Sequence, residues 1–216
     1  HIETGYYAVQ LHDYNIRAEM TATQHCGILR FTFPQADTAR IQVDLARRIG
    51  GSSSYQEFEV VDDHTVEGHM VCGPEDGGFG NGHAKDLRYT VYFRMEFSRP
   101  LTKFGAWSVE FPEGTRRDCT FITTEEFAEF SRNATVHPGR RRAAGEHLGF
   151  YAEFATNPGE QVLVKTGISF VDLDGARNNL QTELDHWDFD RVRRELVAVW
   201  EQELQGVRVA GASERQ

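Results

Sequence analysis

A glycine-rich segment, residues 75–83, carries the most suggestive side chain of the sequence, because Phe79 stands directly between Gly78 and Gly80. Glycine lets a backbone approach a ligand closely, and an aromatic ring stacks well on the C–H face of a sugar. The segment is not a dinucleotide-binding loop, since a strand-like run (89–97) follows it where such a loop would open a helix. We take Gly78, Phe79 and Gly80 as candidate substrate-binding residues, against the simpler interpretation of a mobile hairpin loop.

Catalytic motifs are scarce. The sequence contains no HExxH, CxxC, GxSxG or Walker pattern. Two carboxylates can hydrolyse a glycosidic bond when they flank it correctly, and Glu3, Glu67, Asp76 and Asp86 could line a cleft. Nothing in their neighbourhoods singles out a pair, so solvated surface charge is the better interpretation. We assign no catalytic and no metal-binding residue to this chain.

Composition excludes several classes of protein. With 33 acidic and 23 basic residues the formal net charge is −10, which disfavours nucleic acid as a partner. No apolar run approaches the ~20 residues that a membrane span requires. Cys26, Cys72 and Cys119 lack metal-type spacing, so one disulfide with a spare thiol and three buried thiols both remain open. Their redox compartment is undetermined.

The elements that would position these residues are mostly strands. Alternation of apolar and polar residues predicts strands at 5–11, 16–22, 26–33, 40–45, 55–61, 65–71, 89–97, 104–111, 149–154 and 161–171. Two amphipathic helices follow, with Asp172 or Asp174 near the start of the first and Asp188 as cap of the second. This order predicts a two-layer antiparallel β-sandwich over residues 1–171 and a helical linker over 172–210.

Residues 112–147 break the strand rhythm, and we expect a long insertion or exposed loop there. Its basic run, Arg140 to Arg142, fits a solvated loop better than a site for an acidic partner. Asn133-Ala-Thr135 matches the glycosylation pattern, which is frequent by chance. The chain opens at His1 without an initiator Met and closes on a polar stretch, so we expect a fragment of a longer protein.

Several blocks, in order along the whole chain, resemble the N-terminal domain of glycoside hydrolase family 92, the calcium-dependent exo-α-mannosidases. They are His1 with Glu3 and GYYAV, then AEMTAT and LRFTFP, then GFG, YTVYF and EFSRP, then VKTGISFV, and finally the DFD that starts at Asp188. Each block is weak alone, and their common order is strong. Residues 112–147 depart from the family pattern, so nothing is carried over there.

The resemblance implies a supersandwich-like β domain joined by helices to an α-helical catalytic domain that begins after this chain. It implies inverting hydrolysis of N-glycan-type mannosides, with α-1,2 as the expected linkage. The catalytic carboxylates and the calcium ligands would lie outside this chain, and calcium would be a cofactor of the parent enzyme. The chain's partners would be carbohydrate and its own catalytic domain. The sequence itself shows no export signal. A secreted or periplasmic location is therefore implied by the resemblance alone.

Two other functions remain open at this point. The chain could be a free-standing carbohydrate-binding module that holds glycans without cleaving them. It could also be a structural interaction domain that docks through its two helices.

Overall fold

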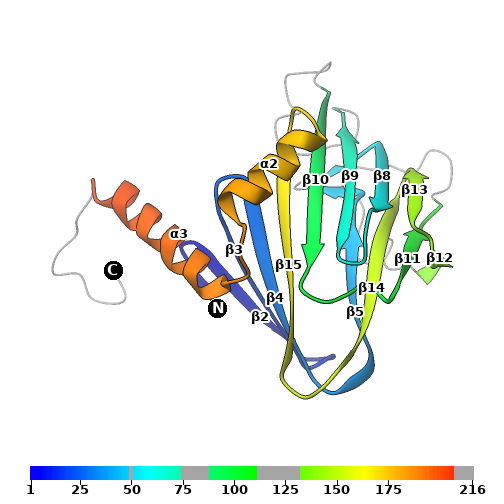
Figure 1. Cartoon of the computed structure of the whole chain (residues 1–216), viewed down its shortest axis with the longest axis horizontal. Helices are drawn as coiled ribbons and strands as arrows, with labels where there is room; N and C mark the ends of the chain where they lie inside the picture. Colours follow the sequence, from blue (N-terminus) through cyan, green and yellow to red (C-terminus); the bar gives the residue numbers. More distant parts are fainter. Residues whose placement is uncertain (49–50, 74–87, 111–131, 207–216) are drawn as a thin grey trace.

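The computed structural model of the chain describes residues 1–48, 51–73, 88–110 and 132–206. An antiparallel sheet, sheet A, forms its central layer. In these residues sheet A has nine strands (Figure 1). Their order is β1 (Ile2–Glu3), β2 (Tyr6–Leu11), β3 (Ile16–Ala22), β4 (Cys26–Phe33), β15 (Glu160–Ser169), β10 (Tyr89–Phe97), β9 (Thr65–Cys72), β8 (Tyr55–Val60) and β13 (Arg142–Gly145). Neighbouring strands in this sheet all pair antiparallel.

Sheet B packs on one face of sheet A and completes the sandwich. Among the described residues its order is β12 (Thr135–Pro138), β11 (Lys103–Ser108), β14 (Leu148–Thr156) and β5 (Ala36–Asp44). A further pair, β6 (Arg47–Arg48) and β7 (Gly51–Ser52), lies outside both sheets. Side chains of both sheets that point between them form the main hydrophobic core. Phe150 lies at its centre, with the rings of Phe58 and Phe97 centred 5.5 and 5.9 Å away.

Two helices cover part of the opposite face of sheet A (Figure 1). Asp172 caps α2 (Leu173–Glu183) by accepting from the Gly175 amide, and Asp188 caps α3 (Phe189–Leu204) by accepting from the Arg191 amide. Apolar side chains of both helices form a second core with strands β2 and β4, here called the junction core. Its buried members are Tyr6, Ala8, Cys26, Ile28, Leu180, Leu184, Phe189 and Val192.

The predicted fold class is confirmed. The fold is mainly β with antiparallel sheets and two C-terminal helices, and each predicted strand lies within the matching observed one or close to its bounds. The helices of the expected linker pack on sheet A, since both contribute to the junction core. No helix in the described ranges is long and apolar enough to cross a membrane.

Residues 112–147, expected to form a long insertion or an exposed loop, contain two short strands in the part that the structure describes, so that part is not simply a loop. Strand β12 extends an edge of sheet B, and β13 extends an edge of sheet A. Each of these edge strands has only four residues, TVHP and RAAG, which is too short for a clear alternation of apolar and polar residues. Two arginines of the basic run contribute to the pairing of β13 with β8. Arg142 forms an ion pair with Glu57 on β8, and Arg141 donates to the Val60 carbonyl at 2.7 Å.

The cysteines that the structure describes are buried. Cys26 lies in the junction core and Cys72 is 1% exposed, while Cys119 falls outside the described residues. Burial raises the pKa of the Cys26 thiol to about 11. That side chain therefore stays protonated near neutral pH and behaves as a small apolar residue.

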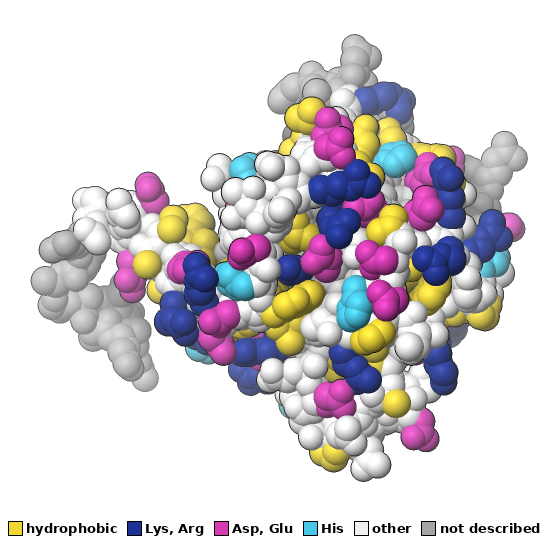
Figure 2. Space-filling view, in the orientation of Figure 1, with side chains coloured by type: hydrophobic (Ala, Val, Ile, Leu, Met, Phe, Trp, Pro, Cys, Tyr) yellow, Lys and Arg dark blue, Asp and Glu magenta, His cyan; other side chains and the backbone are white. Residues whose placement is uncertain are grey.

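The surface seen in Figure 2 carries charges of both signs that alternate over the sheet and helices. This mixture fits a solvated face whose charges pair with one another. The net negative charge is therefore not gathered in one acidic patch on this side of the molecule.

Gly167 is expected to fix how closely α2 approaches sheet A. A Cβ atom at this position would lie 2.6 Å from the Ala176 carbonyl oxygen and 2.8 Å from Leu180 Cβ. Gly167→Ala should therefore displace α2 and lower the free energy of unfolding by about 1–3 kcal/mol, measured by urea unfolding.

The matched control is Gly27→Ala on the adjacent strand, where a Cβ would meet nothing within 4 Å. This change should be neutral or slightly stabilising, because it restricts the unfolded chain. Equal losses in the two variants would contradict the tight packing of α2 on Gly167.

Candidate functional site

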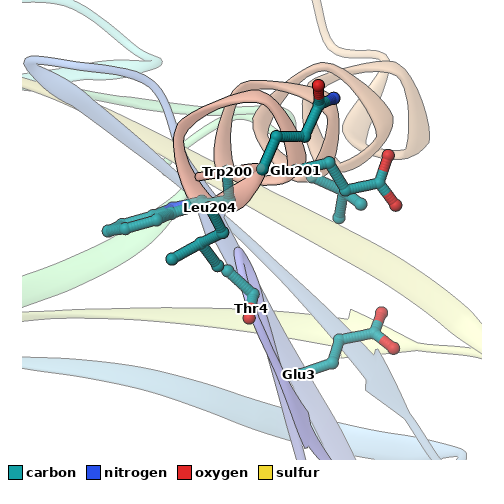
Figure 3. A pocket seen from close by; sticks show the side chains of 7 residues that line it. Glu3, Thr4, Trp200, Glu201 and Leu204 are labelled. Carbon is teal, nitrogen blue, oxygen red and sulfur yellow. The ribbon is translucent and has the colours of Figure 1, made fainter. Parts of the chain in front are cut away.

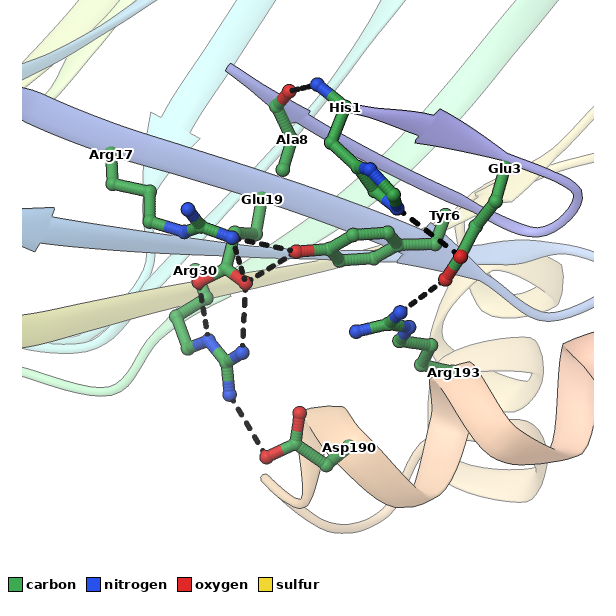
Figure 4. Close-up of polar contacts among 9 residues, drawn as sticks. All are labelled: His1, Glu3, Tyr6, Ala8, Arg17, Glu19, Arg30, Asp190 and Arg193. Carbon is green, nitrogen blue, oxygen red and sulfur yellow. Dashed lines mark hydrogen bonds and ion pairs between the residues drawn. The ribbon is translucent and has the colours of Figure 1, made fainter. Parts of the chain in front are cut away.

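A buried carboxylate, Glu19 on β3, organises the junction between sheet A and α3 (Figure 4). It is 5% exposed and lies opposite Arg30 in the antiparallel pairing of β3 with β4. Arg30 donates to both carboxylate oxygens, from Nε at 2.9 Å and from Nη2 at 3.0 Å. The Tyr6 hydroxyl donates a third bond at 2.6 Å. Both oxygens of the buried Glu19 carboxylate are thus hydrogen-bonded, and its ion pair with Arg30 is bidentate.

Arg30 also joins this pair to the start of α3. Its Nη1 donates to Asp190 Oδ2 at 3.1 Å, and its guanidinium carbon lies 4.2 Å from the centre of the Phe189 ring. Arg193, one turn further along α3, lies 3.7 Å over the Tyr6 ring and pairs with Glu3. Ion pairs and cation–π contacts therefore hold the first turns of α3 onto β1, β2 and β4.

The surroundings of Glu19 lower the pKa of its carboxyl group. Burial by itself raises the pKa of this carboxyl, but hydrogen bonds from Arg30 and Tyr6 and the charges of Arg30 and Arg17 outweigh it. They hold the pKa of Glu19 at about 2, well below its usual value of 4.5. The group is therefore ionised throughout the neutral and mildly acidic range, as its role in an ion pair requires.

A second buried carboxylate, Glu67 on β9, anchors α2 in a similar way. It is 3% exposed and accepts from Arg94 on β10 at 2.6 Å and from Arg177 on α2 at 2.6 and 2.8 Å. Burial raises its pKa, but the hydrogen bonds and charges of Arg177 and Arg94 prevail and lower it. Both helices are thus tied to sheet A through a buried glutamate and arginine partners.

A groove of about 620 Å³ runs along α3 (Figure 3). Glu3 and Thr4 form its floor on the strand side, and Trp200, Glu201 and Leu204 line it on the helix side. Trp200 is 44% and Leu204 58% exposed. The outer face of α3 therefore presents apolar side chains beside carboxylates, in an arrangement suited to contact with further protein.

The predicted ligand-binding residues Gly78, Phe79 and Gly80 lie outside the described residues, as do Asp76 and Asp86. Glu3 lines the α3 groove. Surface charge is the wrong interpretation for Glu67, which is buried and paired with two arginines. Among the described residues no cluster of three or more His, Cys, Asp or Glu side chains could hold a metal ion.

Glu19 and Arg30 did not stand out in the sequence, although a signal existed. The two predicted strands 16–22 and 26–33 form a hairpin, and closing it between Ala22 and Gly27 places Glu19 opposite Arg30. Opposite charges directly across a hairpin indicate an ion pair, although the sequence alone does not show that this pair is buried.

Comparison with known families identifies the two parts that meet at this junction. The model of the glycosyl hydrolase family 92 N-terminal domain matches residues 1–169. The model of the family 92 catalytic domain matches residues 175–216. The chain belongs to glycosyl hydrolase family 92. Its helices α2 and α3, predicted as a linker, lie almost wholly in the catalytic-domain match.

Individual relatives agree with this family. A family GH92 α-mannosidase from Bacteroides thetaiotaomicron is 30% identical, with a TM-score of 0.72 over 96% of this chain. An inverting family GH92 mannosidase of the same organism has a TM-score of 0.69 at 18% identity and shows the shared fold. An "Uncharacterized secreted glycosidase" of Arthroderma benhamiae is 25% identical over 205 residues, 93% of this chain. The chain spans about a quarter of the length of these relatives (24%, 23% and 24%).

Four of the segments that carry the family resemblance meet at the junction. Tyr6 belongs to the GYYAV block, Glu19 to AEMTAT, Arg30 to LRFTFP, and Asp190 to the DFD block. These four residues form one continuous set of hydrogen bonds and ion pairs. The resemblance thus has a structural basis, which is the attachment of the catalytic domain's first helices to the β domain.

Replacing the buried carboxylate by an amide should be costly. Glu19→Gln keeps the size of the side chain but leaves the guanidinium of Arg30 without its main counter-charge in a buried place. We expect the free energy of unfolding to fall by about 3 kcal/mol, measured by urea unfolding. The matched control, Glu195→Gln, breaks an exposed pair with Arg191 on α3 and should cost no more than about 0.5 kcal/mol. Losses of similar size would show that Glu19 is not the anchor.

Acid should remove the contribution of Glu19 in a defined range. The folded carboxyl has a pKa of about 2 against an ordinary value of 4.5, so its stabilisation is complete above pH 4.5 and is lost as pH falls towards 2. The full difference corresponds to about 3 kcal/mol. We expect the stability gap between the wild type and Glu19→Gln to shrink steadily from pH 5 to pH 2.5 in urea unfolding. A gap that stays constant over this range would contradict the lowered pKa.

Proposed function

We propose that this chain is the N-terminal β domain, with the first helices of the catalytic domain, of a secreted family 92 α-mannosidase. The observation that carries the proposal is the junction itself. Segments matched by two successive domain models of one glycosidase family share a buried ion-pair network and a hydrophobic core. The relative with 30% identity is an α-mannosidase, which supports mannosides as the substrate class.

In this proposal the β domain positions the catalytic domain and helps to line the substrate cleft. Hydrolysis then takes place in the remainder of the catalytic domain. An inverting glycosidase needs a carboxylic acid and a carboxylate that are about 6.5–9.5 Å apart, with room for water between them. The buried glutamates described here are instead saturated by arginines, so they are unsuited to proton transfer. The β domain therefore contributes structure and recognition, and no described residue is assigned to the chemistry.

Calcium is proposed as a cofactor of the parent enzyme. The described residues do not fit a calcium site, which takes six to eight oxygen ligands, because no cluster of candidate ligands occurs among them. The metal would therefore be held elsewhere in the parent enzyme. N-glycan-type mannosides with α-1,2 linkages are the proposed substrates, and secretion is supported by the name of the curated fungal relative.

The test compares this chain with a longer protein that continues it through the catalytic domain. The longer protein should release mannose from α-1,2-mannobiose, lose activity with a chelator and regain it with Ca²⁺. Proton NMR of the first product should show β-mannose, as inversion requires. The 216-residue chain should release no mannose under the same conditions. Release by the chain alone would refute the division of labour, and inactivity of the longer protein on every α-mannoside would refute the substrate class.

A positioning role for Arg30 can be tested in the longer protein. Arg30→Lys keeps a positive charge but loses the bidentate contact with Glu19 and the bond to Asp190. We expect kcat to fall several-fold, since small displacements of catalytic groups are costly. Arg191→Lys, which changes an exposed pair of α3, should leave kcat unchanged. Equal kcat values in both variants would exclude a positioning role.

A further inference from the structure

A second groove lies on sheet A, beyond the C-terminal end of α2, and is here called the Trp187 groove. Its volume is about 460 Å³, within the roughly 300–1,000 Å³ typical of small-ligand sites. The turn between β8 and β9 contributes Asp62 and His64, and β10 contributes Glu96. Trp187 comes from the segment between α2 and α3 and forms one side.

The Trp187 ring is held in place and keeps one face for a ligand. It is 37% exposed, and Lys165 Nζ lies 4.6 Å from its centre. Lys165 is itself 4% exposed and is fixed by bonds from Nζ to the Leu184 carbonyl at 3.0 Å and to Glu96 at 3.3 Å. Because the ammonium group occupies one face of the indole, a ligand in the groove could stack only on the other face.

The polar groups around this ring offer both acceptors and a donor. His64 Nδ1 bonds the Phe97 carbonyl at 2.8 Å, so Nδ1 carries the hydrogen and Nε2 is an acceptor in the neutral ring. Each oxygen of Glu96 accepts one bond, from Arg94 at 2.8 Å and from Lys165 at 3.3 Å, and retains a second lone pair. The Ser98 hydroxyl accepts from the Leu163 amide at 2.9 Å and keeps its own hydrogen to donate.

We propose that the Trp187 groove binds a neutral sugar ring of a glycan. An aromatic face beside carboxylate, imidazole and hydroxyl groups matches the C–H face and the hydroxyl groups of a hexose. The carboxylates of Asp62, Asp63 and Glu96 disfavour an anionic ligand. A protein segment is also disfavoured, since the centres of protein interfaces are depleted in charged residues. The proposal goes beyond hydrolysis and does not depend on the linkage or stereochemistry of the parent enzyme.

The ligand should extend further along the same face of the sheet. Side chains two residues apart on a strand share a face, so Glu96, Arg94 and Tyr92 follow one another along β10. The Tyr92 ring is centred 5.7 Å from that of His69 on β9, and His69 is 5.8 Å from Tyr55 on β8. This aromatic row lies about 13 Å along β10 from the groove. An oligosaccharide should therefore bind more tightly than a single sugar.

The test uses this chain labelled with 5-fluorotryptophan, which gives one ¹⁹F resonance for each of Trp107, Trp187 and Trp200, assigned with Trp187→Phe and Trp200→Phe. Methyl α-mannoside and a linear α-linked mannotriose are the titrants. The Trp187 resonance should shift saturably, at several-fold lower concentration for the trisaccharide. Trp107, which is buried, and Trp200, which lines the α3 groove, should not shift. No shift at 50 mM of either sugar, or a shift of Trp200 in place of Trp187, overturns the proposal.

A pair of matched variants provides a second readout by calorimetry with mannotriose. Trp187→Ala should weaken binding about fivefold or more by removing the stacking face, whereas Trp200→Ala should bind as the wild type does. If Trp187→Ala proves unfolded by circular dichroism, Trp187→Phe replaces it and should weaken binding by a smaller factor. Unchanged affinity in a folded Trp187 variant overturns the proposal. Because the chain alone is tested for binding, the outcome is independent of whether the longer protein hydrolyses mannosides.

Discussion

The bidentate pair between Glu19 and Arg30 is the interaction on which the junction of sheet and helix depends. A carboxylate buried between two elements costs several kcal/mol unless its oxygens are fully engaged. Arg30 and Tyr6 meet this need, and Arg30 uses its remaining nitrogen to reach Asp190 on α3. The buried charge thus requires α3 to lie at one place and in one orientation.

The two glutamate anchors explain why sheet A carries charge on a face that helices cover. Glu67 acts on α2 through Arg177 as Glu19 acts on α3 through Arg30. A hydrophobic replacement of similar shape could be as stable, so stability alone does not account for these charges. Directional bonds to named groups define the register of a helix, as polar residues do in coiled coils. The charged face therefore serves to place the helices, and the core beneath it supplies most of the stability.

The sequence was sufficient for the sandwich and helices, because long alternating strands and capped amphipathic helices produce strong local signals. Asp188 illustrates this, since it caps α3 where the pattern predicts, and Asp172, one of the two residues expected near the start of the first helix, caps α2. It was insufficient for β12 and β13, which have only four residues each and whose pairing partners are distant in sequence. The Trp187 groove was missed for a related reason. Its residues come from three separate segments, and only tertiary packing brings them to one place.

The boundary between the two family domains is a boundary in sequence and not in packing. Tyr6, Ala8, Cys26 and Ile28 belong to the match of the N-terminal domain, whereas Leu180, Leu184, Phe189 and Val192 belong to that of the catalytic domain. Together they form one buried core. Cutting the chain near residue 170 would expose this core, and it would leave Arg30 without Asp190 of α3 and Glu67 without Arg177 of α2. The smallest unit that buries its own apolar surface therefore includes both helices, and the β domain and the start of the catalytic domain should unfold together.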